Sequence, residues 1–300
     1  MNNIIHFLRT GFSRSVKSWK GIAIIWLMYL ILAAILSVPL SSVMGRTFGS
    51  SMITNELKDG LNIEAFAELG SYLSAILSFI SPGLLFVLLI GFILTAFLNG
   101  GLFSSLRDGA GKFSVAEFFG ASASNFWTFL LIAFLIRMII YFTGIIFVAV
   151  PGVILIMGNG TTGGTILIVF SVTMFMYLIM LPVLLLAGDY ARAAKVADVN
   201  IKGLKALGYG FSKAFRRFRE SYILMIILFA LQVFFLLLLI NTIPFWKPQT
   251  DSGVFLMFMA SQLLLFMRLA LRTWQYASVT ASGEPYLMKN SPIYSMPDIV

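Results

Sequence analysis

Six predominantly apolar segments are the feature of this sequence that most restricts its fold. They run from about 21 to 43, 82 to 98, 127 to 150, 165 to 186, 222 to 240 and 253 to 277. A helix needs about 20 residues to cross a hydrocarbon core about 30 Å thick, and a spanning segment must satisfy its backbone hydrogen bonds internally. The sequence therefore predicts an all-α integral membrane protein with about six transmembrane helices.

The composition agrees with this class and narrows the chemistry. Hydrophobic residues make up 59% of the chain and charged residues 11%, whereas about a quarter of the residues in soluble proteins are charged. The absence of Cys excludes disulfides, thiolate metal sites and a cysteine nucleophile. A single histidine, His6, cannot form a multi-histidine zinc site or a bis-histidine haem site. We therefore expect no cofactor.

Basic residues are distributed unevenly between the two sides that six spans define. Seventeen of the 21 Lys and Arg residues fall in segments on the side of the N-terminus. Three fall on the opposite side, Arg46, Lys58 and Lys247. Because cytoplasmic loops are enriched in Lys and Arg, we predict that both termini lie in the cytoplasm. The net charge of +9 then reflects cytoplasmic loops and contact with anionic lipid, not a nucleic-acid partner.

Basic amphipathic segments precede two of the spans, over residues 1–20 and 201–220. In each of them basic side chains oppose an apolar face with helical spacing, which is typical of helices that lie at a membrane interface. We expect these basic residues to contact anionic lipid headgroups. They are Arg14, Lys17, Lys20, Lys213, Arg216, Arg217 and Arg219.

The same segments suggest an internal repeat. Gly11-Phe12-Ser13-Arg14 resembles Gly210-Phe211-Ser212-Lys213, and Gly120-Ala121-Ser122 is a weaker third copy. Within a single membrane domain over 1–277, the repeats would cover 1–98, 99–186 and 187–277, each an interfacial helix followed by a two-span hairpin, and all would be parallel. Any basic amphipathic helix before a span looks similar, so the alternative of no repeat stays open. Residues 278–300 are predicted to form an extended cytoplasmic tail.

Four polar side chains are expected within or near the spans: Arg137, Gln232, Gln262 and Arg268. An Arg at mid-bilayer costs about 2.5–3.5 kcal/mol on the insertion scale, so Arg137 should face protein or water. It could pair with Gln232 or Gln262 on a neighbouring helix, or contact an anionic group. Arg268, near the inner end of the last span, should extend to lipid phosphates.

Asp189 lies where the fourth predicted span leaves the membrane. We expect it to cap a helix or to pair with Arg192 or Lys195, because a single carboxylate is weak support for acid–base chemistry. The sequence contains no phosphate-binding loop, dinucleotide fingerprint, His-Glu-x-x-His or Gly-x-Ser-x-Gly motif. These observations predict that the protein is not an enzyme.

Leu181-Pro182, Gly188-Asp189-Tyr190-Ala191-Arg192 and Phe215-Arg216-Arg217-Phe218 carry a family resemblance. Around them the chain resembles uncharacterised bacterial six-span membrane proteins related to the membrane domain found beside some glycerophosphodiester phosphodiesterases. The resemblance implies a membrane fold in the bacterial inner membrane and assigns no activity. The soluble phosphodiesterase domain, with its metal-binding carboxylates and histidines, is absent from this sequence.

Two functions follow as hypotheses. The first is a non-enzymatic scaffold or accessory subunit of a bacterial inner-membrane complex, partnered by other membrane-protein subunits and by anionic lipids. The second is a small transporter or channel for a lipid or another amphiphile. Arg137, Gln232, Gln262 and the spans interrupted by glycine and proline favour the second.

Overall fold

The computed structural model describes residues 2–48, 70–107, 113–157, 163–198, 200–216, 218–242 and 250–290. Within these ranges every regular element is a helix, which confirms the all-α prediction. The chain divides into two compact units, one formed by Met1–Ala23 with Ala96–Val300 and the other by Ile24–Thr95.

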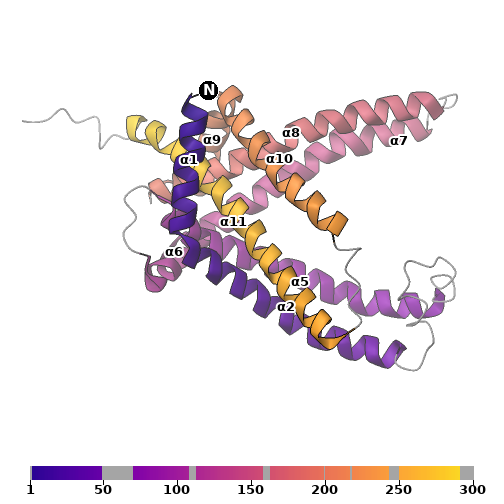
Figure 1. Cartoon of the computed structure of the whole chain (residues 1–300). Helices are drawn as coiled ribbons and strands as arrows, with labels where there is room; N and C mark the ends of the chain where they lie inside the picture. Colours follow the sequence, from indigo (N-terminus) through magenta and orange to yellow (C-terminus); the bar gives the residue numbers. More distant parts are fainter. Residues whose placement is uncertain are drawn as a thin grey trace, which may run out of the picture. The chain divides into compact units, whose positions relative to one another are not determined.

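Most of the described helices are long (Figure 1). In chain order they are α1 (Asn2–Lys17), α2 (Trp19–Phe48), α5 (Gly70–Ser105), α6 (Val115–Gly144), the π-helical turn η2 (Ile145–Ala149), α7 (Val150–Met157), α8 (Gly163–Ala197), α9 (Gly203–Arg216), α10 (Phe218–Thr242) and α11 (Asp251–Asn290).

Several of these helices are long and apolar enough to cross a membrane. Among the described residues there are four such stretches, Leu85–Ser105, Val115–Ile154, Gly163–Ala197 and Ser252–Gly283. A fifth results if α1 and α2, which are bent by 65° at the break between them, are taken together. The described apolar stretch of α10 covers only Met225–Leu238, which is shorter than the roughly 20 residues that a span needs. By length and composition the chain is a multi-pass membrane protein with four or five candidate spans in this part of the sequence.

The sequence predicts breaks at Pro82-Gly83 and at the turn signal Asn99-Gly100-Gly101, and both predictions are wrong. α5 continues through Pro82 and through Asn99-Gly100-Gly101, and α8 continues through Pro182 as far as Ala197. In a membrane helix, the carbonyl group that loses its hydrogen bond at a proline cannot bond to water instead. Neighbouring groups and small adjustments of the backbone satisfy it, so the helix continues. The sequence also predicts a surface or partly embedded helix over 61–80. Residues 61–69 lie outside the described part of the chain, and residues 70–80 belong to α5.

Pro151 does not end the third predicted span, because a π-helical turn precedes it. The proline ring conflicts with the carbonyl group four residues earlier, here that of Phe147, and this residue lies in η2. Wider π turns place the carbonyl groups differently and commonly occur as local bulges within helices. The helix therefore continues as α7, and together with α6 it packs against α8 as the predicted hairpin (Figure 1).

Two further boundaries differ from the predictions. The predicted amphipathic helix over 201–220 ends at Arg216, and Phe218 already belongs to α10. The tail predicted to be extended from residue 278 is helical as far as Asn290, and Ser278, Val279 and Thr280 are buried. Small side chains allow this part of α11 to pack closely, and the helix continues for that reason. Residues 291–300 lie outside the described part of the chain.

The buried residues of the larger unit gather in what we call the hub. It consists of the ends of three long helices, 96–105 of α5, 182–196 of α8 and 273–283 of α11, with α1, α9 and the start of α6 packed on them. From the hub, the α7–α8 pair, α10 and the first half of α11 extend in different directions (Figure 1). The close packing of this unit is therefore concentrated at one end of its spans.

Candidate functional site

Three close helix crossings build the hub. In each of them a glycine faces the backbone of a neighbouring helix, so that a Cβ atom at the glycine would overlap with backbone or side-chain atoms. Such contacts between small residues are a typical means of helix association in membranes. Gly11 of α1 lies on Ser278 of α11, Gly101 of α5 lies on Phe118 and Ser122 of α6, and Gly210 of α9 lies on Ala187 of α8.

A chain of buried polar groups connects three helices within the hub. Asp189 of α8 accepts hydrogen bonds at both carboxylate oxygens, one from Arg192 at 2.8 Å and one from the amide of Gln275 at 3.0 Å. Gln275 of α11 in turn accepts a hydrogen bond from Gln232 of α10 at 2.9 Å. Since a satisfied buried polar network rigidifies the elements that it joins, this chain fixes α8, α10 and α11 relative to one another.

Aromatic residues complete the packing around the polar chain. Phe103 of α5 is fully buried, and its ring lies 5.8 Å from that of Phe129 and 4.8 Å from that of Tyr276. The hydroxyl group of Tyr190 on α8 is hydrogen-bonded to that of Ser282 on α11 at 2.9 Å. Each of the three long helices that end in the hub thus contributes an aromatic ring to its centre, Phe103 from α5, Tyr190 from α8 and Tyr276 from α11.

The geometry at Asp189 suits a structural role. Its two oxygens are engaged by Arg192 and Gln275, and it is 4% exposed. A general acid or base has to be within hydrogen-bond reach of a substrate group, whereas this carboxylate faces partners of its own chain. The polar chain therefore holds helices together and does not present a reactive group.

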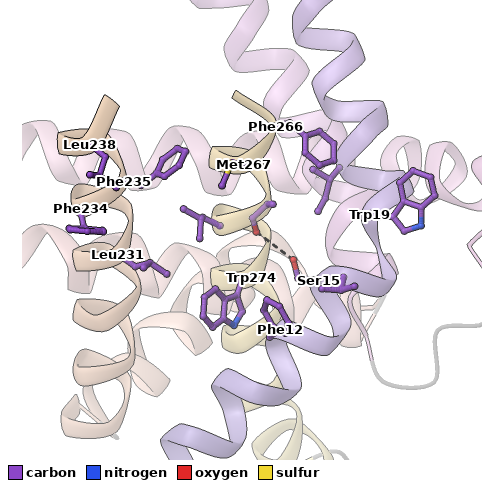
Figure 2. A pocket seen from close by; sticks show the side chains of 14 residues that line it. Phe12, Ser15, Trp19, Leu231, Phe234, Phe235, Leu238, Phe266, Met267 and Trp274 are labelled. Atoms are coloured by element: carbon purple, nitrogen blue, oxygen red, sulfur yellow. Dashed lines mark hydrogen bonds between the residues drawn. The ribbon is translucent and has the colours of Figure 1, made fainter. Parts of the chain in front are cut away.

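A second feature is an apolar groove of about 520 Å³ on the larger unit (Figure 2). The end of α1, the start of α2, α10 and α11 line it, through residues that include Phe12, Trp19, Leu231, Phe266, Ala270 and Trp274. Ser15 is the polar residue of the lining, and its hydroxyl group donates to the Ala270 carbonyl oxygen at 3.4 Å. The groove consequently offers an almost wholly apolar surface.

One end of the groove is held in place by Trp274. Its indole Nε1 donates a hydrogen bond to the Leu8 carbonyl oxygen at 2.9 Å, and its ring contacts that of Phe12 edge to face at 5.3 Å. Figure 2 shows Phe12 and Trp274 together at this end, with Leu238 and Phe266 at the other. The groove is thus bounded by an aromatic side chain whose position both α1 and α11 determine.

The structure places most of the predicted surface residues on the surface. Lys17, Lys20, Arg216 and Arg219 are exposed. Arg14 is half-buried and donates to the Leu106 carbonyl oxygen at 3.3 Å. Lys213 is only 3% exposed, so it does not lie on the surface of α9. Arg217 falls outside the described residues.

The predicted intramembrane polar residues do not come together in one site. Arg137 is exposed on α6, and Arg268 is exposed on α11. Gln232 is bonded to Gln275, as described above. The side-chain oxygen of half-buried Gln262 has no hydrogen-bond partner among the described residues. These four polar residues thus occupy different environments.

The prediction for Asp189 is confirmed in part. The expected ion pair with Arg192 is present at 2.8 Å, but Asp189 lies inside α8 and does not cap a helix end. The contact that the sequence interpretation missed is Gln275, which is buried on α11. The sequence signal was an uncharged amide side chain near the end of the last predicted span.

Known proteins give no further assignment. The chain matches no protein-family model, no curated protein and no solved structure at a significant level. The resemblance to the glycerophosphodiester phosphodiesterase membrane domain therefore stays a prediction. Among the described residues, no three His, Asp or Glu side chains are grouped as metal ligands.

Proposed function

We propose that this chain is a non-enzymatic multi-pass membrane protein that acts as a scaffold or accessory subunit of a membrane complex. The observation that carries the proposal is the contrast between the packed hub and the exposed spans. In an apolar 18-residue segment of Gly163–Ala197 that could cross the membrane, only 6% of the residues are buried, and in the corresponding segment of Val115–Ile154 17% are buried. Helices associate in lipid through close packing and polar contacts, and these spans keep long faces free for helices of other subunits.

The finer architecture is part of the same proposal. The protein would have six spans in a bacterial inner membrane, with α10 as the additional one and both termini in the cytoplasm. The three helix crossings support three parallel repeats, because each helix that precedes a hairpin packs on the end of another hairpin. α6 crosses α5, α9 crosses α8, and α1 crosses α11. The first repeat therefore packs on the last one.

A transporter or channel for a lipid or another amphiphile is the second candidate. The apolar groove favours it, since a volume of about 520 Å³ lies within the range of about 300–1,000 Å³ that ligand sites occupy. Transport also needs a route between the two sides of the membrane. The groove lies beside the hub, and the polar chain through Asp189 occupies the centre of the hub, which favours the scaffold.

Site-specific photocrosslinking tests the scaffold. Leu167 and Phe175 on α8 are 68% and 65% exposed, and a photoreactive residue at either position should give the same few protein adducts in native membranes. Leu204 on α9 is 67% exposed and lies outside the candidate spans, so it serves as the matched control. Adducts with lipid alone at both α8 positions would contradict a partner subunit on this face.

A further inference from the structure

The apolar groove has the size and lining of a site for a single lipid chain. We propose that it binds one acyl chain of an anionic phospholipid, with the headgroup held by Arg9 at the Trp274 end. This assignment is independent of the scaffold function, because it concerns α1, α10 and α11 and not the exposed face of α8.

The dimensions of the groove suit an acyl chain. Along α11 it extends from Phe266 to Trp274, which corresponds to about 12 Å at 1.5 Å per residue. Its volume of about 520 Å³ lies within the range of about 300–1,000 Å³ that small-molecule sites occupy. A segment of an unbranched hydrocarbon chain can therefore occupy it.

The lining matches the chemistry of a hydrocarbon chain. Aromatic and aliphatic side chains form it, and its one hydroxyl group, that of Ser15, is turned to the Ala270 carbonyl oxygen. Trp274 is held by the Leu8 carbonyl oxygen and by the ring of Phe12. Because these residues are already ordered, a chain that enters the groove does not have to order them.

A basic residue stands at the Trp274 end of the groove. Arg9 follows Leu8 directly, and Leu8 accepts the hydrogen bond of Trp274, so the backbone of Arg9 lies beside this end. Arg9 is exposed, and it precedes groove-lining Phe12 by three residues and Val16 by seven, which places the three on one face of α1. Its guanidinium group can therefore contact a phosphate at the mouth of the groove.

Headgroup charge should decide which lipid binds. A chain that moves from the bilayer into the groove exchanges one apolar environment for another, and so gains little from the hydrophobic effect. Each basic residue near an anionic headgroup, by contrast, strengthens binding about fivefold. The site should accordingly prefer phosphatidylglycerol to phosphatidylcholine when the acyl chains are identical.

Fluorescence quenching by brominated lipids tests the proposal in reconstituted full-length protein. A variant that keeps Trp274 and has Phe at the other four Trp positions should be quenched more strongly by brominated phosphatidylglycerol than by brominated phosphatidylcholine. A variant that keeps only Trp127, which is 76% exposed on α6, reports ordinary surrounding lipid and should not distinguish the two. Equal quenching of Trp274 by both lipids would overturn the proposal, as would protection from both.

Substitutions in the Trp274 variant separate the headgroup contact from the groove. Arg9→Gln should lower the apparent affinity for brominated phosphatidylglycerol about fivefold, and Lys205→Gln, which removes a charge from exposed α9, should not. Ala270→Phe fills the groove and should abolish the preference, whereas Ala230→Phe at an exposed position of α10 should keep it. A preference that survives Ala270→Phe would show that the lipid binds elsewhere.

A second readout does not depend on the tryptophan substitutions. In native mass spectrometry, the otherwise unaltered protein from mixed vesicles should retain one phosphatidylglycerol molecule per chain. Ala270→Phe should lose that molecule while it keeps the thermal unfolding temperature of Ala230→Phe. Retention of phosphatidylcholine to the same extent, or of neither lipid, would contradict an anionic-lipid site.

Discussion

Gly210→Ala should lower the free energy of unfolding by about 3 kcal/mol or more, at the upper end of the usual cost of overpacking. The added Cβ atom would overlap with the Ala187 carbonyl oxygen and would lie 2.9 Å from the Ala191 backbone nitrogen. Both are backbone atoms of α8 and cannot rotate away, so α9 has to move off α8. Unfolding in detergent, followed by circular dichroism against denaturant, measures the loss.

Gly208→Ala is the matched control on the same helix. A Cβ atom at Gly208 meets nothing within 4 Å, and alanine is a better helix former than glycine by about 1 kcal/mol. This variant should be as stable as the original protein or slightly more stable. Equal stability of the two alanine variants would mean that α8 and α9 do not cross as described.

Asp189→Leu should be the second severe change, with a loss of about 3–5 kcal/mol, the usual cost of removing one partner of a buried ion pair. The substitution leaves the guanidinium group of Arg192, whose side chain is 13% exposed, without its carboxylate. It also removes the acceptor of the Gln275 amide. The same unfolding measurement in detergent reports the effect.

Two further variants show whether the loss comes from this network. Asp198→Asn, at an exposed position after α8, should change stability by less than about 0.5 kcal/mol. Adding Arg192→Met to Asp189→Leu should recover much of the stability, because an apolar pair of similar volume leaves no buried charge. If Asp189→Leu changed stability as little as Asp198→Asn, Asp189 would not belong to a buried network that stabilises the hub.

The all-helical class and the local charge pairs could be predicted because they depend on nearby residues. Apolar segments of about 20 residues require helices in lipid. Asp189 and Arg192 are three positions apart, so a helix brings them together, and the structure has this ion pair. Short-range information of this kind is fully contained in the sequence.

The helix boundaries were predicted less well because rules from soluble proteins were applied to membrane helices. Pro82-Gly83 and Asn99-Gly100-Gly101 predict breaks, yet α5 passes through both, and α8 passes through Pro182. In water the free backbone groups at a helix break can bond to solvent. In the membrane no water is present to bond them, so the continuous helix is more stable. The break occurs instead at Ser18, between α1 and α2.

Contacts between distant segments could not be predicted from the sequence, because they depend on how the helices cross. Gln275 is 86 positions from Asp189, and nothing in its neighbourhood indicates which helix it faces. The groove likewise requires the end of α1 and α10 to lie on the same side of α11. The resemblance between Gly11 and Gly210 gave a partial signal, since both glycines lie at close crossings.

The proposed architecture has both termini in the cytoplasm, so it places the hub, on which α1 packs, on the cytoplasmic side of the membrane, with the spans extending from it into the bilayer. Single cysteines test it most directly, because the chain has none of its own. Ser212 is exposed on α9 in the hub, and Thr250 is exposed at the far end of α11. With an impermeant thiol reagent on intact cells, a cysteine at Thr250 should be labelled, and one at Ser212 should react only after permeabilisation. Labelling of Ser212 in intact cells, with Thr250 protected, would contradict the account.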